Sequence, residues 1–218
     1  MSNILMTGGT GNLGKSVVET LSAAGYHLHL SVREINEPGT DKISYYQTDL
    51  ESPGQSENLV KSVLDTENDI LAGVFLAGGF VPGGLEKTGW DDISKMISLN
   101  FATAFNTAQS LLAHFRQKGA GKLIFVGAKA AMDSGSAINN VAYSLSKQLL
   151  FNFSEMVNES ENKNGITSHI LLPGTLDTAL NRGFMPDADF SKWTSTIAIA
   201  ETISDIIGGQ EIRSVISF

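Results

Sequence analysis

Short apolar runs alternate with stretches of helical periodicity along this chain, and this alternation constrains the possible folds more than any other feature. The runs that read as buried strands are residues 4–6, 28–32, 43–47, 73–77, 123–126, 168–172 and 215–218. The helical patterns between them fall near residues 12–24, 54–66, 91–118, 138–161 and 196–207. Strands that alternate with helices predict a parallel sheet covered on both faces, with ligands above the carboxyl ends of the strands.

We therefore expect an α/β protein, built as a doubly wound parallel sheet of about seven strands in a single domain that spans residues 1–218. A chain of 218 residues is long enough to bury about 70% of its unfolded surface in one core. The link at residues 34–42 is too short for a packed helix, so this crossover is expected to be a loop.

Charge and composition exclude several classes of function. The net charge of −8 opposes binding to nucleic acid or anionic lipid, because both require a basic face. No window holds the roughly 18 apolar residues of a membrane span, and no secretory signal pattern opens the chain. We expect a cytoplasmic protein that acts on a small molecule.

The chain has no cysteine, which removes disulfides and thiolate metal sites. The four histidines are scattered, without an acidic residue or second histidine at ligand spacing: His27, His29, His114 and His169. We interpret them as structural and predict no metal site.

A glycine-rich turn follows the first apolar run. Residues 7–14 read TGGTGNLG, and a helical pattern continues directly after them. Strand, glycine turn and helix in this order let backbone approach a pyrophosphate and point a helix N-terminus at its charge. The pattern predicts a Rossmann-type nucleotide site at Gly8, Thr10, Gly11, Asn12, Leu13 and Gly14.

Arg33 stands at the end of the second expected strand, where a dinucleotide fold meets the adenosine ribose. An acidic residue there would accept a hydrogen bond from the ribose 2′-OH, whereas an arginine can pair with a 2′-phosphate. Val32 holds the first position and Arg33 the next. We therefore predict NADP(H) in preference to NAD(H), with a solvated surface arginine as the alternative.

Further cofactor contacts are expected where the later strands end. After the third strand, the residues placed to receive the adenine are Asp49 and Leu50. After the fourth, small residues let a cofactor lie close to the backbone at Ala77, Gly78 and Gly79. The turn after the sixth strand is expected to hold the nicotinamide carboxamide through Pro173, Gly174 and Thr178.

Tyr143 and Lys147 are four residues apart in a helical pattern, so they are neighbours on one helix face. A nearby ammonium favours phenolate over phenol, and we expect it to lower the pKa of Tyr143 from its ordinary value of about 10. The pair predicts a proton donor, although the same spacing also occurs in surface pairs.

Taken in order, these motifs resemble the short-chain dehydrogenase/reductase family along essentially the whole chain. The resemblance implies catalytic roles for Tyr143, Lys147 and Asn100, with Thr178 in the turn after the sixth strand. Two positions depart from the family pattern. Asn12 replaces a glycine of the turn, and the expected catalytic serine is missing, because residues 126–131 read VGAKAA.

The missing serine points to a narrower resemblance, to the dihydropteridine reductase branch of the family. Three segments carry it: residues 127–131, 176–182 and 185–193, together with the run from Ala77 to Phe80. Members of that branch use Tyr and Lys without the serine and take NADH through an acidic residue on the second strand. Arg33 and Asn100 depart from that branch, so its substrate specificity is not simply transferred.

The resemblance implies hydride transfer from a nicotinamide to a conjugated C=N or C=O group, with Tyr143 as the proton donor. Lys147 would bind the nicotinamide ribose, and Asn100 would hold a water or carbonyl that relays protons. Ser134 or Ser136 is a possible substitute for the missing serine, in an ordinary ketone or aldehyde reductase. A non-catalytic NADP(H)-sensing protein is a third possibility.

Two further features bear on the substrate and on assembly. The aromatic segment at residues 181–193 is placed to cover a flat ligand, or alternatively to pack as a small satellite core. Helical residues 91–118 and 138–161 are apolar on more than one face, and the family resemblance implies a homodimer or homotetramer.

Overall fold

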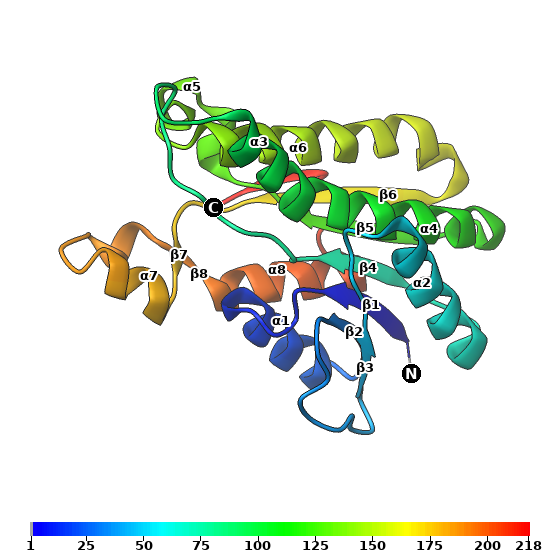
Figure 1. Cartoon of the computed structure of the whole chain (residues 1–218). Coiled ribbons are helices and arrows are strands. Elements are labelled where there is room, and N and C mark those ends of the chain that lie inside the picture. The colour runs from blue at the N-terminus through cyan, green and yellow to red at the C-terminus, as the bar shows by residue number, and fades with distance from the viewer. Residues whose placement is uncertain (1) are drawn as a thin grey trace.

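The computed structural model describes residues 2–218 and contains a seven-stranded sheet whose neighbouring strands all run parallel (Figure 1). Its strands are β1 (Asn3–Thr7), β2 (His27–Val32), β3 (Ile43–Gln47), β4 (Ala72–Phe75), β5 (Gly121–Val126), β6 (Ile166–Leu172) and β9 (Val215–Ser217). They lie in the order β3-β2-β1-β4-β5-β6-β9. The predicted doubly wound parallel sheet is confirmed.

Helices cover both faces of the sheet because alternate strand residues point to opposite sides. The helices are α1 (Asn12–Ala23), α2 (Pro53–Glu67), α3 (Trp90–Ile97), α4 (Thr103–Lys118), α5 (Ser134–Ala137), α6 (Val141–Glu161), α7 (Ala179–Phe184) and α8 (Thr196–Gly208). On β1, Ile4 and Met6 pack with α1 and α8, whereas Leu5 packs with α2, α4 and α6. The core is therefore two apolar layers, one on each face.

The chain reverses its direction of growth across the sheet at β1. Strands β2 and β3 lie on one side of β1, and β4, β5, β6 and β9 lie on the other. In open parallel sheets, ligands bind at this reversal, outside the carboxyl ends of the strands. The glycine turn leaves β1 at that point.

The predicted helix at residues 91–118 is a composite. It consists of α3, a π-helical turn at Ser98–Ala102 and α4. The link between β2 and β3 carries no helix over residues 33–42, as predicted.

A small outlying unit was not predicted. Strands β7 (Leu176–Asp177) and β8 (Thr194–Ser195) pair with each other and, with α7, project beyond the carboxyl ends of the main sheet, at the left of Figure 1. Each of these strands has two residues, too few to give a periodic pattern. Within residues 2–218, no helix is both long and apolar enough to cross a bilayer.

Candidate active site

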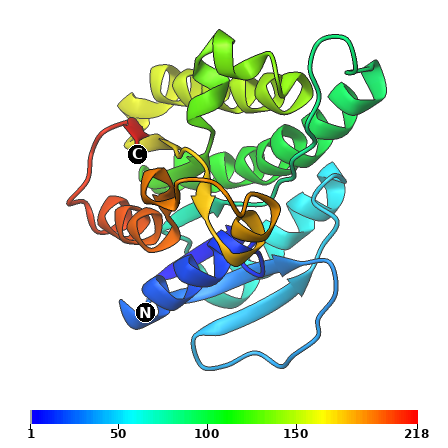
Figure 2. The same ribbon diagram turned by 90° about the vertical axis from the view of Figure 1, so that its left-hand side faces the viewer.

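A cleft of about 990 Å³ lies at the carboxyl ends of β1, β2, β3 and β4. Figure 2 looks onto this edge of the molecule. The structure brings eight of the predicted cofactor residues into its lining: Gly8, Thr10, Gly11, Arg33, Asp49, Leu50, Ala77 and Gly78. Residues far apart in the sequence thus meet at one site, because their strands are parallel neighbours.

The remaining predicted cofactor residues of the glycine turn have other positions. Leu13 is buried in the core between α1 and α8. A Cβ at Gly14 would lie 2.2 Å from the carbonyl oxygen of Gly8, so glycine is required for the turn to pack on its own helix. Seven other predicted residues are not among the described residues that line the cleft: Asn12, Gly79, Tyr143, Lys147, Pro173, Gly174 and Thr178.

The start of α1 offers free backbone donors next to the cleft. Gly11 caps this helix without a side-chain hydrogen bond, and Thr10, Gly11 and Asn12 are exposed. The first N–H groups of a helix have no partner within it, and they carry the positive end of the helix dipole. This end of α1 is therefore suited to an anionic group.

Arg33 and Ser31 lie together where β2 enters the cleft. Arg33 is exposed and forms no ion pair within residues 2–218. Ser31 is buried, and its hydroxyl has no hydrogen-bond partner among the described residues. Sequence reasoning overlooked Ser31, because only the surrounding atoms show that its hydroxyl is buried without a partner.

Asp49 is only partly available for a ligand. Its Oδ1 accepts a hydrogen bond from the N–H of Glu51 at 3.0 Å, which shapes the turn after β3. The carbonyl oxygen of Leu50 accepts from Nδ2 of Asn106 at 3.1 Å. The turn that would contact an adenine is therefore held by two hydrogen bonds, one within the turn and one from α4.

Tyr143 and Lys147 lie on α6 as neighbours. The Nζ atom of Lys147 is 5.9 Å from the centroid of the Tyr143 ring. The same Nζ donates to the carbonyl oxygen of Val126 at 2.7 Å, where β5 ends. The ammonium is thus held at the carboxyl edge of the sheet.

The pKa of Tyr143 contradicts the prediction from spacing. Burial raises it to about 12, and burial also lowers the pKa of Lys147 to about 8. The predicted decrease for Tyr143 is wrong because removal of water from the phenolate outweighs an ammonium that is itself desolvated. At neutral pH the phenol consequently keeps its proton.

Asn100, in the π-helical turn, uses its whole side chain for contacts within the protein. Its Oδ1 accepts from the N–H of Gly79 at 2.8 Å, and its Nδ2 donates to the Gly79 carbonyl at 3.1 Å and to Ser146 Oγ at 2.9 Å. The Ser146 hydroxyl in turn donates to the carbonyl of Tyr143 at 2.7 Å. Asn100 therefore joins the loop after β4 to the helix that carries Tyr143 and Lys147.

The segment where the missing serine is expected, residues 126–131, contains no hydroxyl. In it, Ala128 and Ala131 are buried, whereas Lys129 is exposed. Both candidate substitutes, Ser134 and Ser136, are exposed, and the Ser136 hydroxyl donates to the Asp133 carboxylate at 2.6 Å. Within the described residues, no hydrogen bond joins either hydroxyl to Tyr143.

The outlying unit around α7 has an internal cluster of its own. Thr178 caps α7, since its Oγ1 accepts from the N–H of Asn181 at 3.1 Å. Arg182 lies 4.6 Å over the ring of Phe190, and the Phe190 and Trp193 rings are 4.8 Å apart. Phe190 and Trp193 are half-buried, whereas Phe184 is 75% exposed.

One aromatic residue lies directly beside Tyr143. The rings of Phe80 and Tyr143 meet edge to face, with centroids 5.0 Å apart, and Phe80 is 58% exposed. An exposed apolar ring next to a phenol gives the site a surface that a flat ligand can contact.

The expectation that the histidines are scattered is wrong for two of them. His27 and His29 share a face of β2, and their rings stack with centroids 4.5 Å apart. Residues separated by one position in a strand point to the same side, and helical spacing rules miss this pairing.

A parallel sheet that reverses at β1, a glycine turn at that point, and a Tyr-Lys helix beside it define a nucleotide-dependent oxidoreductase fold. The family model described as short chain dehydrogenase matches residues 2–189, and the chain belongs to that family of oxidoreductases. The family resemblance inferred from the sequence is thereby confirmed.

Individual relatives agree with this assignment. The chain is 31% identical to a dihydropteridine reductase from Dictyostelium discoideum, over 92% of this chain and 85% of the relative. It is 22% identical to a 3-oxoacyl-(acyl-carrier-protein) reductase from Salmonella typhimurium, over 98% and 87%. A solved structure of ElxO with NADP bound superposes with a TM-score of 0.89 at 19% identity, over 99% of this chain and 96% of that one.

Proposed function

We propose that this protein is an NAD(P)H-dependent reductase that reduces a flat, conjugated C=N or C=O compound of the quinonoid dihydropterin type. The observation that carries the proposal is Tyr143 beside Lys147 on α6, with no hydroxyl in residues 126–131, where a second hydrogen-bond donor would stand. The similarity to a dihydropteridine reductase supports the same substrate class.

The cleft suits a phosphorylated dinucleotide. The uncapped start of α1 offers N–H donors to a pyrophosphate, and the unpartnered Ser31 hydroxyl offers a polar contact near the ribose. The free guanidinium of Arg33 favours a 2′-phosphate, so NADPH is the preferred form. When bound, the reduced nicotinamide supplies the hydride.

The residues of α6 would then carry out the proton transfer. The Tyr143 hydroxyl carries its proton at neutral pH because its pKa is about 12. Lys147 would exchange the Val126 carbonyl for a ribose hydroxyl, and its charge would stabilise the phenolate left after proton transfer. Asn100 would keep the loop at Gly79 in register with this helix.

A single donor is enough for one class of substrate only. In a simple ketone the negative charge gathers on one oxygen, and losing one of two donors costs about 3 to 4 kcal/mol of transition-state stabilisation. A conjugated ring spreads that charge over several atoms and so needs a second donor less. Phe80, exposed beside Tyr143, gives such a ring an apolar surface to lie against.

Steady-state assays with quinonoid dihydropterin and with simple ketones, each with NADPH and NADH, test the proposal. We expect turnover of the pterin with NADPH and at least about 100-fold lower kcat/KM for simple ketones, the loss that one missing donor produces. Rapid reduction of simple ketones would instead favour an ordinary carbonyl reductase.

Two variants separate binding from chemistry. Arg33→Ala should raise KM for NADPH about tenfold or more and leave KM for NADH unchanged, because only the phosphate contact is lost. Lys163→Ala is the matched control for loss of charge, because Lys163 is exposed and forms no ion pair among the described residues. Tyr143→Phe should lower kcat about 100-fold or more while nucleotide binding persists. A cellular phenotype that persists in Tyr143→Phe but is lost in Arg33→Ala would instead support a non-catalytic sensing role.

A further inference from the structure

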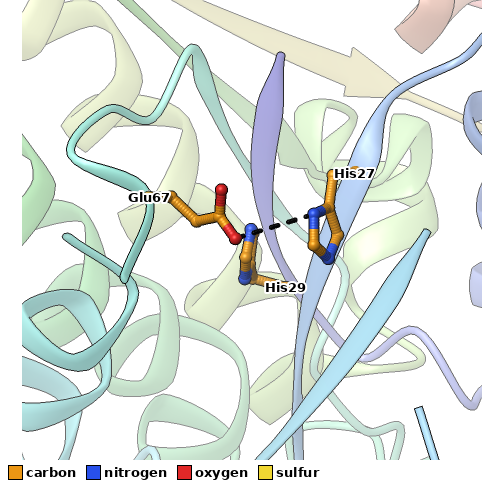
Figure 3. Close-up of side chains that lie close together, drawn as sticks. All are labelled: His27, His29 and Glu67. Atoms are coloured by element: carbon orange, nitrogen blue, oxygen red, sulfur yellow. Dashed lines mark ion pairs between the residues drawn. The ribbon is translucent and has the colours of Figure 1, made fainter. Parts of the chain in front are cut away.

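A second cluster of ionisable groups lies away from the cleft (Figure 3). His27 and His29 project from the same face of β2, and Glu67 reaches them from the last turn of α2. Each offers one ligand atom, and these atoms all lie within 4.8 Å of one another. The closest charged contact joins His27 Nδ1 to Glu67 Oε1 at 3.7 Å.

Surrounding polar groups hold both rings in orientation. His27 Nε2 lies 3.0 Å from Ser44 Oγ, which leaves Nδ1 facing the Glu67 carboxylate. His29 Nε2 lies 3.3 Å from Asn3 Oδ1, and its Nδ1 lies 3.1 Å from the hydroxyl of Tyr46. Histidine ligands of metals usually have such a partner on the second ring nitrogen, because it fixes the tautomer and directs the lone pair.

Neutral His27 can meet the Glu67 carboxylate in two ways, because the Ser44 hydroxyl can either donate or accept. When Ser44 donates to Nε2, Nδ1 carries the ring proton and faces the carboxylate as a donor. When Nε2 donates to Ser44, Nδ1 carries a lone pair, and a metal ion can bind between this lone pair and the carboxylate. Both ring nitrogens of His29 have hydrogen-bond partners, so one of them would exchange its partner, Tyr46 or Asn3, for the ion.

We propose that His27, His29 and Glu67 form a site for a divalent transition metal ion of the zinc type. Two imidazoles and one carboxylate are the donor set that suits zinc, whereas magnesium and calcium prefer oxygen ligands. Ligands of a tetrahedral zinc ion are about 3.3 Å apart, so the three groups must close by small rotations. His27 and Glu67 are half-buried, and water would complete the coordination.

The position of the cluster defines what such an ion would do. His27 is the first residue of β2 and pairs with Asn3 of β1, whereas the cleft lies at the opposite ends of these strands. The ion would therefore join the end of α2 to the sheet and stabilise the fold, without touching the reacting groups.

Isothermal titration of the full chain with Zn²⁺, after treatment with chelator, tests the proposal. We expect one ion per chain, an increase in Tm, and no comparable binding of Mg²⁺. His27→Gln and Glu67→Gln should each weaken Zn²⁺ binding by more than about tenfold, since even loss of a supporting contact costs that much. Both side chains are half-buried, so these variants leave the fully buried His29 itself in place.

His114→Gln is the matched control. His114 lies 3.3 Å from Asp69 but forms no three-ligand group among the described residues, so its loss should leave binding unchanged. Absence of binding to the wild-type chain would overturn the proposal. Equal affinity in His27→Gln and Glu67→Gln, or equal weakening in His114→Gln, would also overturn it.

Discussion

At the scale of single residues, the ammonium of Lys147 is the charged group closest to Tyr143 on α6. Its Nζ is buried and held by one carbonyl, that of Val126, and burial lowers its pKa to about 8. A lowered pKa means that Lys147 is charged below about pH 8 and neutral above it. Both of its proposed roles, binding a ribose and stabilising phenolate, depend on the charge.

We therefore expect kcat/KM to be level up to about pH 8 and to fall at higher pH. Lys147→Arg is the matched variant, because a guanidinium keeps its charge to a pKa above about 12. In that variant the decline should move to higher pH, whatever the absolute rate. A decline that stays near pH 8 in Lys147→Arg would assign it to another group.

The positions of Tyr143 and Lys147 could be predicted from the sequence, because helical geometry makes residues four apart neighbours. The direction of the Tyr143 pKa shift could not, because it depends on burial by segments distant in the chain. Ser31 was overlooked for a related reason. An unpartnered buried hydroxyl is recognised only once the surrounding atoms are known.

At the scale of elements, the π-helical turn between α3 and α4 carries the side chain that connects two other segments. Its Asn100 reaches Gly79 and Ser146 together, and those residues belong to different segments. Apolar periodicity predicted a helix at residues 91–118 but not the π-helical turn within it. A π-helical turn costs free energy locally and persists when tertiary contacts stabilise it, which a local pattern does not reveal.

Ser146→Ala tests how strongly α6 depends on this connection. The variant leaves one buried N–H of Asn100 with only the weak acceptor Met96 Sδ at 3.8 Å, which should lower the free energy of unfolding by about 1 to 3 kcal/mol. KM for the nucleotide should rise as the loop at Gly79 loosens. Both quantities can be measured, by urea denaturation and by steady-state kinetics.

Ser144→Ala is the matched control on the same helix, because the Ser144 hydroxyl is also buried but has no partner. Ser144→Ala should leave the free energy of unfolding unchanged or raise it slightly. A similar loss of stability in the two variants would mean that packing, rather than the hydrogen bond to Asn100, accounts for the effect.

At the scale of the whole molecule, the sheet and its two layers could be predicted because alternating strands and helices permit few topologies. The unit of β7, β8 and α7 could not, since its short strands are defined by pairing with each other rather than by burial. The composite helix and this unit are the parts where local pattern and final structure diverge.

Assembly into oligomers remains a prediction, and α6 shows where contact is expected. Leu145, Leu149 and Met156 form an apolar stripe along it, with exposed fractions of 41%, 40% and 67%. Light scattering should show a homodimer or homotetramer. Leu149→Glu should lower the measured mass toward that of a monomer, because it places a charge in the contact. Leu180→Glu, on α7, is the control. A wild-type monomer would contradict the prediction.

The helix-free link between β2 and β3 has a consequence for how the protein diversifies. It borders the cleft beside Arg33, and it is tied back by a bridge from Thr40 to Ile43 and by the Tyr45 hydroxyl on Glu37. Doubling the length of such a loop costs only about 0.6 kcal/mol in chain entropy. Substitutions and insertions in this link can therefore change the nucleotide preference, while the sheet beneath it keeps its structure.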